Sequence, residues 1–362
     1  MKITSVETFP ISLPLSKPVQ MSHVTIHVSN NVLVKITTDE GVVGWGEGVE
    51  AMDVTGDNQM RIKASIDDLG ARIVGRDALA RTAIWADLRS AVHGNTTAIG
   101  AIDIALHDIA GKAAGVPVHE MIGGANRTEI PALTLLGSGR PDADLETFEE
   151  KMAAGFRWFK LKLGIADPAV EAETFRKISE VSGDAVLSGD TNAGWSEQTA
   201  ARFIREVDGL GIRFLEQLTG PTDAMVRLAA WSPVALCADE SAKTFDDILA
   251  LRGTGIAGVS LKLIKHVGIT GVMRAAAICD AIGLAVNLAG KIAESSIAAA
   301  ANLHCAAAMV GTRYGCSPAS QSISADVTDD PVLPVNGTFV VPTGPGLGVD
   351  VDETMVRKLM GS

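Results

Sequence analysis

The chain has 362 residues, of which 47% are hydrophobic and 20% are charged, and its formal net charge at pH 7 is −12. A chain of this length and apolar content is typical of two domains with sizeable cores. The negative charge argues against nucleic acid or an anionic membrane as a partner, because both repel an acidic surface.

The cysteines and the amino terminus indicate the cellular location. The four cysteines have no CxxC spacing, so we expect reduced and buried thiols. The first four residues lack the apolar segment of a signal peptide, and there is no run of about 18 uncharged apolar residues. We therefore expect a cytoplasmic protein without a membrane span.

The first 125 residues predict an α+β domain. Residues 3–13 alternate as a strand, and the apolar runs 32–36 and 42–47 flank a turn that contains Gly41, which predicts a hairpin. Three stretches then have apolar residues at helical spacing, at residues 62–73, 80–92 and 96–113. The segment MIGGA at 121–125 breaks this pattern and marks the end of the domain.

From residue 126 onward, strands and helices alternate. A strand at 130–136 is followed by short apolar runs that each end at a charged residue. From Lys162, the steps to the charged residues at the next four strand ends are 28, 26, 23 and 23 residues. A step of one strand plus one helix is the repeat of a (β/α)₈ barrel. Two more strands are expected, at 285–288 and near 312–316.

The expected fold is therefore α/β, with a TIM-type (β/α)7-8 barrel at residues 126–329 and an N-terminal α+β capping domain at residues 1–125. Residues 330–362 are rich in proline, glycine and valine, and the segment PTGPGLG at 342–348 predicts a loop. We expect this tail to fold back and complete the capping domain.

The charged residues at the predicted strand ends carry the chemistry, because barrel enzymes place their active sites there. Asp190, Glu216 and Asp239 each follow an apolar run. Any one of them could cap a helix or form an ion pair, but three carboxylates in one small pocket require a cation. Oxygen ligands without histidine or cysteine predict one Mg²⁺ ion, for which Mn²⁺ could substitute, and argue against Zn²⁺.

Three lysines flank these carboxylates. Lys160 and Lys162 are two residues apart, so their side chains leave a strand on the same face. Lys262 is four strands away from Lys162, which places it across the mouth of the barrel. Two amines on opposite sides of a bound carboxylate could remove and return its α-proton while the metal stabilises the enediolate. We also expect cationic surroundings to lower the pKa of the lysines toward that of a useful base.

These motifs resemble the enolase superfamily, and within it the muconate lactonizing enzyme subgroup of the mandelate racemase/muconate lactonizing enzyme family. The resemblance covers nearly the whole chain. It rests on GWGE at 44–47, KLK at 160–162, DTN at 190–192, EQ at 216–217, DE at 239–240, KLIK at 262–265, AESS at 293–296 and PGLG at 345–348.

The resemblance implies that the three carboxylates hold Mg²⁺, that Lys162 and Lys262 are the acid/base pair, and that Lys160 polarises the substrate carboxylate. Catalysis is assigned to Lys262 rather than to Lys265, the second lysine of the KLIK segment. We further expect a homo-oligomer, either a dimer or an octamer, whose substrate is a small carboxylate.

Two positions differ from the subgroup. Dipeptide epimerases carry a DxD near the last strand to hold the dipeptide ammonium, where this chain has SQS at 320–322. Muconate cycloisomerases carry a glutamate near the end of the eighth strand, where this chain has CSP at 316–318. Both differences argue against the corresponding activity.

The capping loops near residues 15–30 and 48–58 contain no cluster of aromatic residues, which disfavours an aromatic site for a quaternary ammonium. We therefore expect a racemase, an epimerase or a dehydratase of a small amino acid derivative, such as a hydroxyproline or another proline derivative. The alternatives are a muconate-type cycloisomerase, a Schiff-base aldolase and a non-catalytic binding barrel. Candidate substrate contacts are Ser22, His23, Thr134, Asn192 and Glu294.

Overall fold

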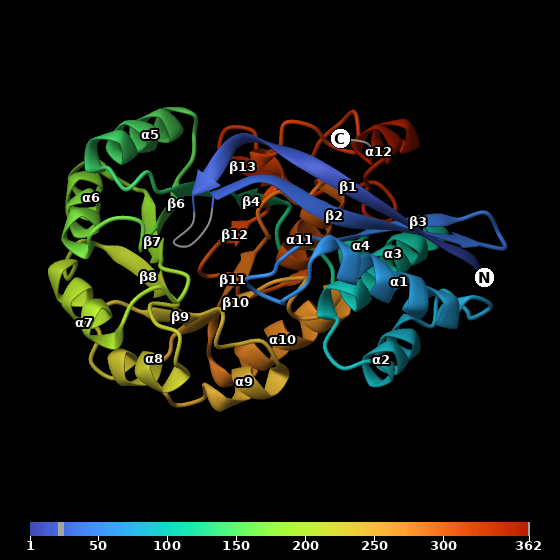
Figure 1. Cartoon of the computed structure of the whole chain (residues 1–362), viewed down its shortest axis with the longest axis horizontal. Coiled ribbons are helices and arrows are strands. Elements are labelled where there is room, and N and C mark those ends of the chain that lie inside the picture. Colours follow the sequence, from blue (N-terminus) through green and yellow to red (C-terminus); the bar gives the residue numbers. More distant parts are fainter. Residues whose placement is uncertain (21–24, 361–362) are drawn as a thin grey trace.

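A three-stranded antiparallel sheet and its helices form the amino-terminal part of the molecule (Figure 1). The computed structural model describes residues 1–20 and 25–360 of the chain. The sheet has the order β1 (Ile3–Gln20), β2 (Thr25–Thr38) and β3 (Val43–Gly48). The helices that follow are α1 (Gln59–Ile73), α2 (Arg81–Ala91), α3 (Thr96–Ala114) and the short α4 (Val118–Met121).

The three predicted helices of this part are confirmed to within three residues at their ends. The first strand is longer than the predicted segment 3–13. It continues past Pro14 because it stays paired with β2, where Val19 lies opposite Ile26 after an irregularity in the register. Local alternation could not predict this extension, since it depends on the partner strand.

Eight parallel strands form the barrel, and their order in the sheet is their order in the chain. They are β5 (Leu133–Leu136), β6 (Trp158–Lys162), β7 (Val186–Asp190), β8 (Ile212–Glu216), β9 (Leu236–Ala238), β10 (Gly258–Leu261), β11 (Ala285–Ala289) and β12 (Cys316–Ser317). A parallel bridge between Ala132 and Cys316 joins the two ends of the sheet, so the ring closes.

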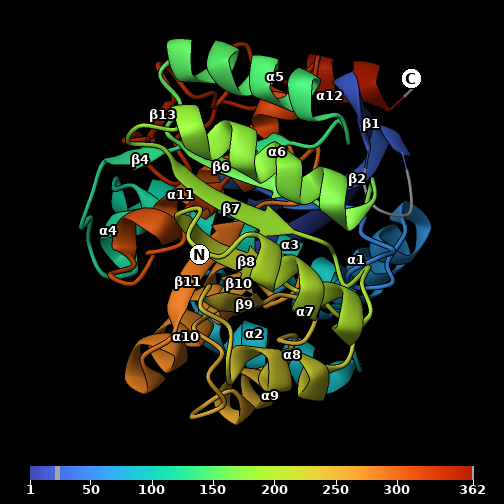
Figure 2. The ribbon, with the colours of Figure 1, turned by 90° about the vertical axis from the view of Figure 1, so that its left-hand side faces the viewer.

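Helices cover the outside of this ring, and Figure 2 shows several of them side by side over the strands. They are α5 (Pro141–Ala153), α6 (Pro168–Val181), α7 (Glu197–Glu206), α8 (Thr222–Ala229), α9 (Phe245–Ala250), α10 (Gly268–Ile282) and α11 (Ser296–Ala308). The predicted TIM-type barrel with a separate amino-terminal α+β part is thus confirmed. The carboxyl ends of all eight strands meet at one mouth, as parallel strands require.

The strand predicted at 130–136 is in fact two strands. β4 (Glu129–Pro131) pairs with β13 (Thr338–Val340) of the tail, whereas β5 belongs to the barrel. Between them, the backbone N–H of Ala132 donates to the carbonyl of Gly337. The last barrel strand, β12, begins where the predicted segment 312–316 ends and is only two residues long.

The tail contacts the amino-terminal sheet. Helix α12 (Glu353–Leu359) packs on β1, and Nζ of Lys35 on β2 lies 2.5 Å from Oε1 of Glu353. We therefore propose the division made from the sequence, with residues 1–125 and 330–362 as the cap and residues 126–329 as the barrel.

The four cysteines are free and buried, which confirms the prediction of reduced thiols. They lie in barrel elements, at positions 237, 279, 305 and 316. Among the described helices, none has both the length and the apolar content that a bilayer crossing needs.

Candidate active site

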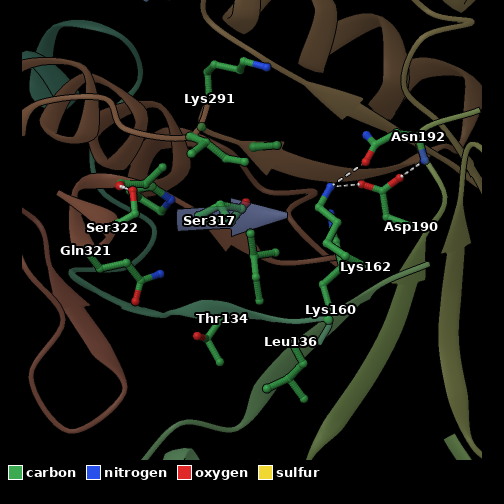
Figure 3. A pocket seen from close by; sticks show the side chains of 18 of the residues that line it. Thr134, Leu136, Lys160, Lys162, Asp190, Asn192, Lys291, Ser317, Gln321 and Ser322 are labelled. Carbon is green, nitrogen blue, oxygen red and sulfur yellow. Dashed lines mark hydrogen bonds and ion pairs between the residues drawn. The ribbon is translucent and has the colours of Figure 1, made fainter. Parts of the chain in front are cut away.

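A cavity of about 470 Å³ opens at the carboxyl ends of the barrel strands (Figure 3). Side chains from the barrel form most of its wall. The amino-terminal part contributes residues 16–19 of β1, together with Asp53 and Val54 from the loop after β3. Barrel and cap therefore shape this cavity together.

The three predicted metal ligands lie at the carboxyl ends of adjacent strands, and two of them, Asp190 and Glu216, line the cavity. Asp190 and Glu216 are the last residues of β7 and β8 and lie opposite each other in the register of the two strands. Asp239 directly follows β9. Their side chains are at most 4% exposed. The barrel thus brings together three carboxylates that are far apart in the sequence.

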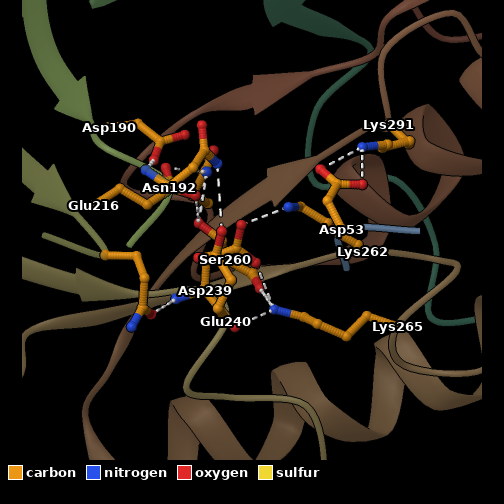
Figure 4. Close-up of polar contacts among 12 residues, drawn as sticks. Asp53, Asp190, Asn192, Glu216, Asp239, Glu240, Ser260, Lys262, Lys265 and Lys291 are labelled. Atoms are coloured by element: carbon orange, nitrogen blue, oxygen red, sulfur yellow. Dashed lines mark hydrogen bonds and ion pairs between the residues drawn. The ribbon is translucent and has the colours of Figure 1, made fainter. Parts of the chain in front are cut away.

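Each of these carboxylates contacts one of the predicted lysines; Figure 3 shows the contact of Lys162 with Asp190, and Figure 4 that of Lys262 with Asp239. Nζ of Lys162 donates to Oδ2 of Asp190 at 2.6 Å. The other two pairs are Lys160 with Glu216 and Lys262 with Asp239. All six predicted catalytic and metal-binding residues therefore form one cluster.

Lys265 differs from Lys262 in its surroundings. Its Nζ atom donates to Oδ1 of Asp239 at 2.6 Å, to the carbonyl of Asp239 at 2.7 Å and to the carbonyl of Ser260 at 2.8 Å. These three bonds use all the donors of an ammonium group. Lys262, by contrast, lines the cavity. The geometry supports Lys262 as the lysine that faces the substrate.

The pKa values of two lysines differ from the expectation. Burial lowers the pKa of Lys262, but Asp239, Glu240 and Glu216 outweigh it and raise the pKa above its ordinary value. Burial also lowers the pKa of Lys160, and the nearby Glu216 again reverses the sign. The expectation of lowered values fails in this structure because the nearest charges are carboxylates rather than cations.

The three carboxylates lie close together, as ligands of one divalent cation must. Burial raises the pKa of Glu216, Lys160 lowers it, and the neighbouring Asp190 and Asp239 raise it, so the carboxylates are close enough to repel one another. Within residues 1–20 and 25–360, no three acidic, histidine or cysteine side chains are arranged as ligands of one ion, since each carboxylate turns to a lysine.

Glu240 adds a further acidic group beside this cluster. Its Oε2 atom is buried and has no hydrogen-bond partner in the described structure. Burial, followed by the charges of Asp239 and Asp190, raises the pKa of Glu240 to about 7. A buried carboxylate oxygen without a donor, next to three more carboxylates, suits a hard cation, because Mg²⁺ takes oxygen ligands. The residues present therefore fit the predicted metal.

The predicted substrate contacts are placed differently from one another. Thr134 on β5 and Asn192 after β7 both line the cavity (Figure 3). Oδ1 of Asn192 accepts a hydrogen bond from Nζ of Lys162 at 2.9 Å. Ser22 and His23 lie outside the described residues.

Glu294 lies behind the wall of this cavity. Its Oε1 atom accepts hydrogen bonds from the backbone N–H of Ala319 at 2.9 Å and from Nδ2 of Asn302 at 3.1 Å. The side chain is buried, and burial raises its pKa to about 8. In this position Glu294 holds the loops after β11 and β12 together rather than facing the cavity formed by the described residues.

Glu47 of the GWGE segment joins the cap to the barrel. A side-chain carbon on Gly46 would lie 2.0 Å from the carbonyl oxygen of Ala101, so only glycine lets β3 lie this close to α3. Glu47 then reaches the start of α11, where it accepts hydrogen bonds from Oγ of Ser295 at 2.7 Å and from the backbone N–H of Ala298 at 3.2 Å. Burial raises the pKa of Glu47 to about 7.

Sequence reasoning missed one ion pair at the cavity. Nζ of Lys291 lies 2.7 and 2.9 Å from the two carboxylate oxygens of Asp53 (Figure 4). A signal for Lys291 was present, since it follows the apolar strand β11 just as the other charged residues follow their strands. Its pairing with Asp53 had no signal, because the two residues are 238 positions apart.

Comparison with known proteins places this site in a family. A model of the mandelate racemase/muconate lactonizing enzyme N-terminal domain matches residues 3–123, and a model of the enolase C-terminal domain-like fold matches residues 144–355. The chain belongs to the mandelate racemase/muconate lactonizing enzyme family. It is therefore an enzyme of the enolase superfamily, as predicted.

Several relatives of the chain are isomerases by name. Chloromuconate cycloisomerase of Cupriavidus necator is 34% identical over 366 residues, which cover 99% of this chain and 98% of that protein. The L-Ala-D/L-Glu epimerase of Bacillus subtilis is 29% identical, with 96% of this chain and 97% of that protein covered. The crystal structure of 2-chloromuconate cycloisomerase from Rhodococcus opacus has a TM-score of 0.94 and 28% identity over 99% of both chains.

Proposed function

We propose that the chain is a Mg²⁺-dependent isomerase that transfers a proton at the α-carbon of a small dicarboxylate, and that this reaction is a cycloisomerisation of a muconate-like substrate. The observation that carries the proposal is the charge of the cavity wall. Among the described residues, six lysines line the cavity against three carboxylates, Asp53, Asp190 and Glu216. Because the cationic side chains outnumber the anionic ones, the cavity attracts an anion with more than one charge.

The proposed roles follow from the positions of the side chains. Asp190, Glu216 and Asp239 would hold Mg²⁺, or Mn²⁺ in its place, which supplies positive charge next to the substrate carboxylate. Lys160 is buried beside the same carboxylates and would donate to the substrate carboxylate. Lys162 and Lys262 line the cavity from different strands and would exchange the proton at the α-carbon.

In a cycloisomerisation, one carboxylate oxygen of the diene attacks a double bond and forms the lactone C–O bond. The electron pair of that double bond moves toward the other carboxylate and gives an enolate, whose α-carbon then takes a proton from a lysine. No atom is gained or lost apart from this proton. Lys162 or Lys262 supplies it, and the cap over the cavity would exclude water from the enolate.

Relatives support this reaction over the one expected first. Chloromuconate cycloisomerases align with almost the full chain, whereas none of the relatives described above is a hydroxyproline enzyme, an aldolase or a binding protein by name. The segment CSP at 316–318 stands where the resemblance to the subgroup's muconate enzymes leads us to expect a glutamate. We take this difference to alter which dicarboxylate fits, because it changes the wall of the cavity and leaves the proton-transfer residues in place.

The test is direct turnover. The Mg²⁺-loaded protein should consume cis,cis-muconate or a chloromuconate, seen as loss of the diene absorbance, and in deuterated water the lactone should carry one deuterium at the α-carbon. A protein that binds Mg²⁺ yet converts none of these dienes would refute the cycloisomerase proposal.

A racemase or epimerase is the second candidate. The favouring observation is that Lys162 and Lys262 reach the cavity from β6 and from the end of β10, four strands apart. Such a pair could act on opposite faces of one α-carbon. Loss of optical activity from an N-acyl amino acid with a second carboxylate, without diene turnover, would favour this candidate instead.

A further inference from the structure

The cavity has two ends of different character (Figure 3). One end is formed by residues of β6, β7 and β8 and by Lys262 after β10, and it presents the predicted metal ligands Asp190 and Glu216. The other end is formed by β11, β12 and β5 and presents the uncharged polar side chains Thr134, Ser317, Gln321 and Ser322. Lys291 also lies at this end, in the loop after β11. It is the only charged residue among the described cavity-lining residues of these three strands and of the loops that directly follow them.

Lys291 is a buried cation, only 8% exposed. Lys291 lines the same cavity as Lys162 and Lys262, and burial lowers the pKa of its ammonium group. Keeping a charge at a buried position is costly unless a partner compensates it. Here the partner is a single carboxylate from the cap.

Asp53 leaves part of this ammonium free. Its two oxygens take the two hydrogen bonds of Lys291, at 2.7 and 2.9 Å, while an ammonium group has three donors. Asp53 is itself 46% exposed, and both members of the pair line the cavity. A second anion can therefore approach Lys291 without displacing Asp53.

We propose that Lys291 binds the second carboxylate of the substrate and thereby selects dicarboxylates over monocarboxylates, with Asp53 of the cap holding the ammonium in place. The inference rests on the proposed function in one respect, that the first carboxylate lies at the end of the cavity with the metal ligands. Lys291 lies toward the other end, where the second carboxylate of an extended diacid would reach.

The test uses binding of unreactive ligands, so that it does not depend on turnover. Adipate and its monomethyl ester have nearly the same length and differ by one charge. Calorimetry on the Mg²⁺-loaded full chain should show that the wild type binds adipate roughly tenfold to a hundredfold more tightly, the range for a hydrogen bond to a charged group. In Lys291→Met, the ratio of the affinity for adipate to the affinity for the ester should fall close to one, because only adipate should bind more weakly.

The matched control is Lys177→Met. Lys177 also forms an ion pair with an aspartate, Asp142, at 2.5 Å, but on the outer helices of the barrel. It should leave the adipate ratio unchanged, since it removes the same charge outside the cavity. If Lys291→Met does not fold, Lys291→Met with Asp53→Asn removes both charges and leaves neither group unpaired.

Two results would overturn the inference. One is a wild type without preference for adipate over its ester. The other is a Lys291 variant that keeps the ratio or weakens both ligands equally, as expected if the ion pair only fastens the cap. Turnover of muconate is a separate measurement: a protein with the Lys291-dependent ratio and no muconate turnover would lose the proposed reaction but keep this inference.

Discussion

Lys162 and Lys262 are the residues on which the proposed proton transfer depends. They approach the cavity from different strands, and each contacts a predicted metal ligand, Asp190 or Asp239. This arrangement places each amine next to the site of charge development. It also means that each lysine has its own carboxylate partner, so the two can be tested independently.

For the second candidate reaction, a racemisation or epimerisation, we predict that Lys162 and Lys262 serve opposite faces of the α-carbon. Lys162→Met and Lys262→Met should each reduce α-proton exchange in deuterated water by roughly a hundredfold or more, the scale of losing a general acid or base. With a chiral carboxylate that the wild type exchanges, the two variants should lose exchange with opposite enantiomers. Proton NMR of each enantiomer measures this.

A reaction of the cycloisomerase type modifies the expected pattern. One lysine then delivers the proton and the other matters less. Full exchange with both enantiomers in either variant would remove the two-base arrangement, whereas a strong loss in only one variant would identify the proton donor.

At the scale of elements, the contact between β3 and α11 joins the cap to the barrel. Glu47 from β3 accepts hydrogen bonds from Ser295 and Ala298 at the amino end of α11, a favourable place for a carboxylate. The charges that face Glu47 in this contact include Asp326, which raises its pKa, and the neighbouring Glu294. The junction is therefore buried, acidic and sensitive to pH.

We predict that this junction loses stability as the pH rises. Glu47 has a pKa of about 7 in the folded chain and an ordinary value of 4.5, so the folded state holds a proton that the unfolded state releases. The protonated Glu47 therefore contributes on the order of 3 kcal/mol to the free energy of unfolding. This contribution is complete below pH 4.5 and is lost as the pH rises through about 7. Urea unfolding between pH 5 and pH 8 measures it.

The comparison variant is Glu47→Gln, which cannot ionise. Glutamine also loses hydrogen bonds, so its stability will be lower overall, and the informative quantity is the slope with pH. The wild type should lose more unfolding free energy than the variant between pH 5 and pH 8. Equal slopes would show that Glu47 is not protonated in the folded chain.

At the scale of the whole molecule, the metal site exists only in the folded barrel. Its three carboxylates lie on three strands and come together through the parallel sheet. An ion that binds the folded state alone stabilises it by mass action. Metal binding and global stability are therefore coupled in this chain. The homo-oligomer and the cytoplasmic location expected from the sequence stay predictions.

We predict that Mg²⁺ raises the unfolding temperature. At about a hundred times its Kd, Mg²⁺ should raise the Tm by roughly 3 °C for a chain of this size. In Glu216→Gln the affinity should fall at least about tenfold, because a coordinating charge is lost. Calorimetric titration gives the affinity and scanning calorimetry gives the Tm. Unchanged affinity in this variant would contradict the assignment of Glu216.

The sequence alone determined the series of strands and helices and the residues at the strand ends. One strand and one helix recur at a regular step, and side chains alternate along a strand, so both properties are local and are visible without a structure. For the same reason, the positions of Lys160, Lys162 and the three carboxylates at one mouth could be predicted.

Only the tertiary structure decided how the cap meets the barrel. It pairs Lys291 with Asp53 across 238 positions, turns Glu294 behind the cavity wall, lengthens β1 along β2 and sets carboxylates beside the lysines so that the pKa values of Lys160 and Lys262 rise. These features depend on which surfaces pack together. Contacts between segments that are distant in the sequence leave no periodic pattern in it. The ion pairs and pKa shifts that depend on such contacts could therefore not be predicted from the sequence.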